Sequence, residues 1–144
     1  MAGLLIPADD AVAAELRRWA ATPFDWTRDN CGLAVLYYVE RVTMRRLDPA
    51  PCAVGRIGML RMIDRAGGYL TLARRAMARL ECPQTAKVRR GDVGLIMQDS
   101  DPIAAIALEA GQAHSVFWAA RGDRAAVIRT GEPLAAWRVA CHRQ

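Results

Sequence analysis

Two residue types in this chain could together perform nucleophilic catalysis, namely a cysteine at the start of a predicted helix and a histidine in a predicted strand. Cys31 follows the polar, aromatic stretch Thr22–Asn30 and opens an apolar run, so its thiol is expected in the first turn of a helix. Unpaired backbone N–H groups and the helix dipole favour a thiolate at that position. Such a nucleophile also needs an imidazole within hydrogen-bond reach.

His114 and His142 are the two histidines of the chain. His142 lies beside the C-terminus, where chains are often poorly ordered, so His114 is the better candidate for a general base. Cys31 and His114 are therefore the candidate catalytic residues. Each also has a structural interpretation, because cysteines at buried helix ends and lone histidines in apolar strands commonly serve packing. Their spacing leaves both interpretations open.

The cysteines do not predict a metal site. Cys31, Cys52, Cys82 and Cys141 are scattered, and none lies within the short separation that zinc-binding pairs usually show. We therefore expect reduced thiols and no cofactor, with a cluster assembled from distant cysteines as the alternative.

The composition predicts a globular protein without a membrane span. The chain has 144 residues, of which 53% are hydrophobic. Charged residues interrupt every apolar run well before the roughly 20 residues that a spanning helix requires. The start MAGLLIPADD lacks the basic region of a signal peptide. We expect a protein made in a cytoplasm and either kept there or carried out within a larger assembly.

Positive charge is concentrated in the middle of the chain. The net charge is +5, and residues 28–90 hold thirteen Lys/Arg against five Asp/Glu. Such a bias can indicate an anionic partner. The basic residues form no contiguous block, however, and we favour the solvated faces of helices over nucleic acid as the explanation.

The hydrophobic pattern predicts helices followed by strands. Helices are expected over Ala8–Ala20, with Val12, Leu16 and Trp19 on the buried face and Glu15 elsewhere, and over Cys31–Thr43. Two more are expected around the turn Gly67-Gly68, one carrying the stripe Ile57, Leu60 and Ile63 and one over Tyr69–Leu80. Short strands follow within Gly91–Met97, Pro102–Leu108, Ala113–Ala119, Ala125–Arg129 and Leu134–Val139, separated by turns that include ARGDR.

This order predicts an α+β fold in which N-terminal helices pack on a short-stranded antiparallel meander. We expect one domain over residues 1–144, mainly helical over 1–90 and sheet over 91–140.

Four short motifs resemble the NlpC type of papain-like cell-wall peptidases, and more particularly small phage tail proteins related to that fold. The motifs are Phe-x-Trp-x-Arg-x-x-Cys at 24–31, Ala-Gly-Gly at 66–68, Arg-Gly-Asp-Val at 90–93 and Ala-Trp-Arg-Val at 136–139. The likeness spans roughly residues 15–140. It implies a papain-like fold, with Cys31 in the place of the nucleophile and a Gly-Asp pair opening the first strand.

One departure from the family pattern bears on activity. The resemblance implies a catalytic histidine at the start of the second strand, where this chain reads Asp101-Pro102-Ile103. His114 instead falls where the family carries its third, orienting polar residue. Loss of a general base typically costs 10²–10⁴-fold in rate. We therefore expect a retained fold with a degraded or rewired site.

The resemblance implies a bacteriophage tail component, acting at the tail tip or in tail assembly, that docks to other tail proteins. It would be made in the bacterial host cytoplasm and carried in the virion tail. One alternative is an active cysteine hydrolase that cleaves peptidoglycan stem peptides. A second is a helix-turn-helix DNA-binding module over residues 56–80. Trp26, Phe117, Trp118 and Trp137 could anchor a partner, but we expect at least two of them in the core.

Overall fold

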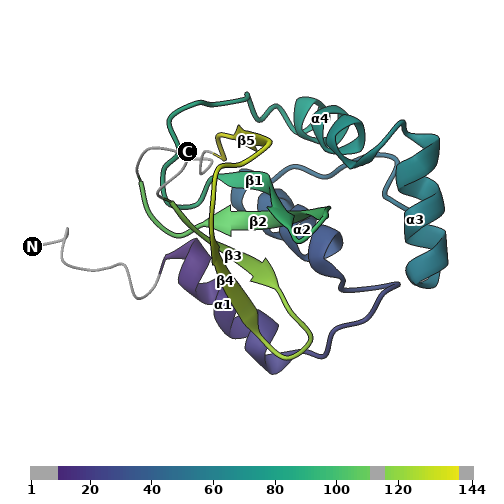
Figure 1. Cartoon of the computed structure of the whole chain (residues 1–144), viewed down its shortest axis with the longest axis horizontal. Coiled ribbons are helices and arrows are strands. Elements are labelled where there is room, and N and C mark those ends of the chain that lie inside the picture. Colours follow the sequence, from purple (N-terminus) through teal and green to yellow (C-terminus); the bar gives the residue numbers. More distant parts are fainter. Residues whose placement is uncertain (1–9, 111–115, 140–144) are drawn as a thin grey trace, which may run out of the picture.

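The computed structural model describes residues 10–110 and 116–139. It has an α+β fold, which confirms the predicted class. The helices are α1 (Ala11–Ala21), α2 (Cys31–Thr43), α3 (Gly55–Arg65) and α4 (Tyr69–Arg79). The strands are β1 (Val93–Gln98), β2 (Asp101–Ala107), β3 (Phe117–Arg121), β4 (Ala126–Thr130) and β5 (Ala135–Trp137). Figure 1 shows the helices arranged around one sheet.

Local sequence signals account for the helix ends. The Asp10 carboxylate accepts a hydrogen bond from Ala13 N, and the Asn30 side chain accepts one from Leu33 N, so both residues are N-caps. α3 ends where Gly67 N and Gly68 N donate to the carbonyls of Asp64 and Ile63. Gly67 has φ +92°, a left-handed conformation that glycine adopts without a side-chain clash.

The strands form one antiparallel sheet in the order β4-β3-β2-β1-β5. β1 to β4 make the predicted meander. β5 departs from it, because it crosses to the opposite edge and pairs with β1, with Val93 opposite Trp137. The prediction of a continuous meander is therefore wrong for the last strand. All three residues of β5 are buried in this position, whereas the last three residues of the edge strand β4 are exposed.

The main core lies between the sheet and the helices. α2 packs against β2 and β3. Trp19, Tyr38, Leu95, Ile106 and Trp137 belong to one buried cluster on this side, whereas Trp118 and Ile96 belong to a second cluster. The alternation of Leu95 and Ile96 between the clusters follows the two-residue period of a strand. Trp118 and Trp137 thus fill the core, as predicted for at least two of the aromatic residues, while Trp26 and Phe117 are exposed.

The motifs at 90–93 and 136–139 meet in space. Asp92 is 1% exposed, and its carboxylate accepts hydrogen bonds from Arg138 Nε at 3.0 Å and Val139 N at 3.1 Å. It also accepts from Arg89 N at 2.9 Å. The preceding Arg90 pairs with Asp10, the N-cap of α1. Asp92 therefore fastens the segment after β5 to the start of β1, and Arg90 fastens α1 to the same region.

The predicted buried face of α1 is confirmed for Val12, Leu16 and Trp19, but three other predictions for α1 and α3 are wrong. Ile57 and Leu60 are exposed, and α3 instead turns Met59, Met62 and Ile63 toward a cavity beside α2 and α4. Glu15 is buried rather than solvent-facing. The pattern of one helix cannot show which of two apolar faces is buried, as in α3. It also cannot show that a carboxylate such as Glu15 has hydrogen-bond donors in the core.

Candidate active site

The structure places Cys31 as predicted, at the first position of α2. The loop that leads into Cys31 is fixed by Asn30, whose buried side chain both donates and accepts a hydrogen bond. Asn30 Nδ2 donates to Trp26 O at 2.8 Å, and Asn30 Oδ1 accepts from Leu33 N at 2.8 Å. The loop before the helix is closed by paired backbone hydrogen bonds between Asp25 and Asp29. The thiol therefore projects from a defined loop-to-helix junction.

The environment of Cys31 favours the neutral thiol. Burial raises the pKa of the Cys31 thiol, and hydrogen bonds from the backbone N–H groups of Gly32 and Cys31 itself lower it by less. We expected the helix N-terminus to lower the pKa of Cys31, and the backbone donors do so. Desolvation of the charged form raises the pKa by more, so the expectation of a thiolate is wrong. A nucleophile resting as a neutral thiol needs a base to remove its proton.

Tyr69, the first residue of α4, lies against this junction. A Cβ added at Gly32 would stand 2.4 Å from the Tyr69 hydroxyl, so the hydroxyl occupies the space that any larger residue would need. Burial raises the pKa of Tyr69 above its usual range, and the charge of a Cys31 thiolate raises it further. Tyr69 therefore stays protonated and is placed to act as a donor rather than as a base. The sequence analysis missed this residue, although the small Gly32 beside a candidate nucleophile was a signal of close approach.

The second candidate, His114, lies outside the described residues, as does His142. The pairing of Cys31 with His114 therefore stays a prediction. The described strands next to α2 present small or apolar side chains to it. Ala104 and Ile106 of β2 and Ala119 of β3 belong to the same buried cluster as Ala34 and Val35 of α2. In β2 the face turned to α2 thus carries no titratable group.

A buried charge cluster holds the loop before Cys31 against the sheet. Arg121, whose side chain is 0% exposed, ends β3 and lies 3.4 Å from Asp29 Oδ2. Its guanidinium group also donates to Trp19 O at 2.5 Å and to Thr22 O at 2.7 Å, both at the end of α1. Arg18 reaches the same Asp29 oxygen at 3.2 Å. Arg121 was predicted in a turn, which is wrong, and no local signal marked it for burial.

Glu15 extends this cluster along α1. It accepts hydrogen bonds from Trp19 Nε1 and from Arg18 Nε, each at 2.8 Å, and it pairs with Arg41 of α2. A buried carboxylate with three donors is adequately compensated. The cluster therefore ties α1 to α2 and to the sheet, and it contacts the loop that leads to the candidate nucleophile.

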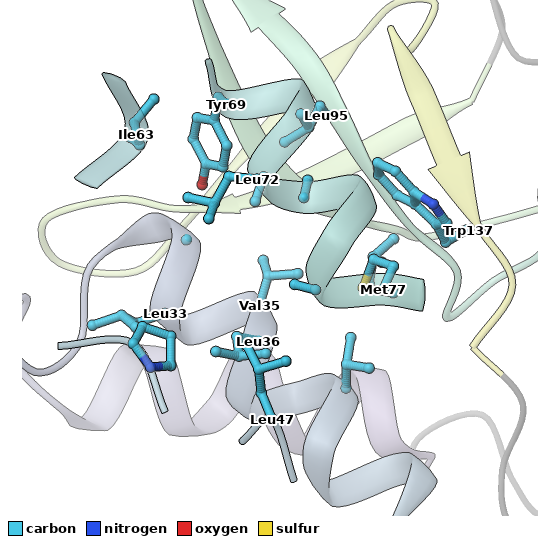
Figure 2. Close-up of a pocket in the computed structure, with 18 of the residues that line it drawn as sticks. Leu33, Val35, Leu36, Leu47, Ile63, Tyr69, Leu72, Met77, Leu95 and Trp137 are labelled. Carbon is cyan, nitrogen blue, oxygen red and sulfur yellow. The ribbon is translucent and has the colours of Figure 1, made fainter. Parts of the chain in front are cut away.

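An apolar cavity of about 110 Å³ adjoins Gly32 and Tyr69, between α2, α3, α4 and the sheet. Figure 2 shows that the labelled side chains around it are apolar apart from the Tyr69 hydroxyl and the Trp137 indole nitrogen. Such a lining offers packing rather than acid–base chemistry.

The described residues offer no metal site. No group of three or more His, Cys, Asp or Glu side chains able to hold an ion occurs among residues 10–110 and 116–139. Cys31, Cys52 and Cys82 are free thiols, and Cys141 lies outside the described residues. No helix in these same two ranges is long and apolar enough to cross a membrane.

The chain belongs to a family described as a domain of unknown function, DUF6950, whose sequence model matches residues 7–139. No curated protein and no solved structure matches the chain.

Proposed function

We propose that this chain is a bacteriophage tail component, acting at the tail tip or in tail assembly, that uses a papain-like, NlpC-like fold for docking and not for hydrolysis. The observation that carries the proposal is the state of Cys31. It stands at the start of the helix that packs on the sheet, where the resembled peptidases carry their nucleophile, yet burial raises its thiol pKa. The face that β2 turns toward α2 carries Ala104 and Ile106, and no imidazole.

The arrangement of the motifs supports the fold part of the proposal. Cys31 begins a helix packed on an antiparallel sheet, and the Gly91-Asp92 pair immediately precedes its first strand. These are the relations that the resemblance to the NlpC type implies. They are relations of order and packing, and the activity of a fold has to be argued from its site.

Two exposed aromatic residues support the docking part. Trp26 is 41% exposed and Phe117 is 45% exposed, whereas the other two aromatic candidates are in the core. Large aromatic side chains on the surface are the usual anchors of protein interfaces. Trp26 belongs to the motif that leads into Cys31. The loop that borders the active site in the resembled peptidases would here bind another tail protein.

The catalytic half of the proposal is tested on intact peptidoglycan. Purified chain is incubated with sacculi, and released stem-peptide fragments are measured by mass spectrometry for the parent, Cys31→Ala and His114→Ala. We expect no release that distinguishes the parent from either variant. Release by the parent that both substitutions abolish would overturn the proposal and establish the hydrolase.

The tail half is tested on particles. Tails are purified from the phage whose genome encodes the chain, and the chain is quantified by mass spectrometry against the other tail proteins. We expect a fixed stoichiometry in tails or in an assembly intermediate. Absence from both would refute a tail role whatever the outcome of the peptidoglycan assay.

The active hydrolase is the second candidate, and one observation favours it. The thiol of Cys31 receives hydrogen bonds from backbone N–H groups and lies close enough to Tyr69 for its charge to act on that hydroxyl. Donors of this kind can stabilise an oxyanion during acyl transfer. In that case His114 would supply the base, and alkylation of Cys31 would slow when His114 is replaced by Ala.

A further inference from the structure

An exposed apolar surface joins the loop before Cys31 to α3. Its apolar members are Trp26 (41% exposed), Val54 (78%), Ile57 (65%) and Leu60 (48%). Ile57 and Leu60 are three residues apart on α3, so they lie on one helical face. Single exposed apolar residues are normal on a protein surface, but several gathered on two adjoining segments are characteristic of a contact site.

Specific contacts hold the two segments together. Gly55 N, at the first position of α3, donates to Thr27 Oγ1 at 2.9 Å. The Arg56 guanidinium carbon lies 6.0 Å from the centroid of the Trp26 ring, within the range of a cation–π contact. Trp26 also meets the edge of Phe24, with ring centroids 5.1 Å apart. The exposed tryptophan is therefore fixed against α3, and little conformational freedom would be lost when a partner covers it.

The surface carries positive charge without internal neutralisation. Arg28, Arg56, Arg61 and Arg65 are all exposed, and within the part of the chain that the structure describes none of them pairs with a carboxylate. Asp25 and Asp64 are the acidic residues of the same two segments. The Asp25 carboxylate is already engaged by Thr27 N and Arg28 N. The net charge of the surface is thus positive and available to a partner.

We propose that this surface, made of Trp26, Val54, Arg56, Ile57, Leu60 and Arg61, binds an acidic segment of another protein that presents apolar anchor residues. The inference rests on the proposed docking role and names the chemistry of the docked partner. Apolar anchors would cover Ile57 and Leu60, while carboxylates would meet the unpaired guanidinium groups. Complementary charge of this kind speeds association and selects the partner.

The same features weigh against other occupants. A second copy in a symmetric dimer would bring identical basic surfaces face to face, with like charges opposed. Nucleic acid would pair with the arginines but would leave exposed aliphatic side chains without a partner, because protein–DNA interfaces are more polar than protein–protein ones. Figure 1 shows α3 at the outer side of the helical layer, so a peptide segment could reach it along its length.

The experiment uses the full chain and a random peptide display library. Peptides are selected on the parent, and the enriched sequences are synthesised together with versions in which each Asp and Glu is replaced by Asn or Gln. We expect enrichment of peptides that combine acidic and apolar residues. The neutralised versions should bind more weakly, with a difference that shrinks as salt rises.

Two variants of the surface and two matched controls locate the binding. Ile57→Ser and Arg61→Glu each alter an exposed residue of α3, and each is expected to weaken binding at least about tenfold. Ile128→Ser and Arg129→Glu make the same chemical changes at exposed positions of the edge strand β4 and should leave binding unchanged. Circular dichroism checks that all four variants remain folded.

Several outcomes would overturn the inference. Enriched peptides that are basic or uncharged would contradict the charge argument, and equal losses in the β4 controls would contradict the location. Tighter binding of a random DNA duplex than of any acidic peptide, lost in Arg61→Glu, would assign the surface to nucleic acid. A concentration-dependent dimer in sedimentation, lost in Ile57→Ser, would assign it to a second copy. All these measurements use purified chain, so they fail or succeed independently of the tail-particle assay.

Discussion

Replacing Arg121 with Met tests whether a buried arginine holds the loop before Cys31 in place. Arg121 lies at the end of β3, yet it donates to the carbonyls of Trp19 and Thr22 and pairs with Asp29. Methionine preserves much of the unbranched apolar stem and removes the guanidinium group. The two carbonyl oxygens then lose their donor, while Asp29 keeps its ion pair with Arg18 and its hydrogen bond from Thr22 Oγ1.

The expected cost follows from these contacts. Each buried carbonyl left without a donor costs about 1–3 kcal/mol. Removing one partner of a buried ion pair costs about 3–5 kcal/mol in total. Because Arg18 still neutralises Asp29, we expect the lower end, a loss of about 3 kcal/mol in the free energy of unfolding. For a chain of this size that corresponds to a fall of roughly 10 °C in Tm.

Urea unfolding followed by circular dichroism measures the loss, with Arg129→Met as the control. Arg129 is exposed on β4 and pairs with no carboxylate of the described chain, so its removal should change stability by less than about 0.5 kcal/mol. Arg121→Lys should fall between the parent and Arg121→Met, because an ammonium group keeps the charge and cannot reach both carbonyls as the planar fork does. A loss below about 1 kcal/mol for Arg121→Met would refute the reasoning.

Three further perturbations test the junction around Cys31 and the fastening of the sheet. Gly32→Ala should destabilise the chain by about 1–3 kcal/mol in thermal or urea unfolding, because its Cβ would meet the Tyr69 hydroxyl at 2.4 Å. Tyr69→Phe removes that oxygen and should rescue Gly32→Ala, and a double variant no more stable than Gly32→Ala would contradict the clash. Folding raises the pKa of the Cys31 thiol, so the parent loses free energy of unfolding as pH rises above the thiol pKa of the unfolded chain. Between about pH 8 and about pH 10, Cys31→Ser should therefore lose less free energy of unfolding than the parent does. Asp92→Ala should cost about 3 kcal/mol, because Arg138 loses its carboxylate partner while it keeps Thr85 and Lys87, and because the buried backbone N–H of Val139 loses its acceptor. It should also increase limited proteolysis at Arg138, and unchanged cleavage there would argue against the fastening.

Much of the local structure could be predicted from the sequence. The bounds of α2 were predicted correctly, because Asn30 supplies a cap and the apolar stripe after Cys31 has the helical period. The turn between α3 and α4 was predicted from Gly67-Gly68 for a similar reason, since that conformation depends on the glycines themselves. The apolar runs after Arg90 likewise correspond to β1 and β2. Caps, glycine turns and hydrophobic periodicity depend on residues that are close in the sequence, so they can be recognised without the tertiary structure.

Other features depend on residues that are far apart in the sequence. Arg121 is buried because its partners are at the end of α1, roughly a hundred positions away. On α3, Ile63 was placed correctly but Ile57 and Leu60 were not. Met59 and Ile57 are both apolar, and the cavity beside α2 and α4 decides which of them faces inward. The position of β5 beside β1 has no local signal, because a strand's own pattern does not identify its neighbour.

For the candidate site, the sequence by itself determined that a cysteine opens a helix after an aromatic loop and that the second strand has no histidine. The tertiary structure decided the state of that cysteine. Burial of Cys31 in the folded chain, close to Tyr69, raises its thiol pKa, although the helix N-terminus alone would lower it. The physical reason is that dipole and backbone donors are local properties of a helix end, whereas desolvation depends on every element that packs around the thiol.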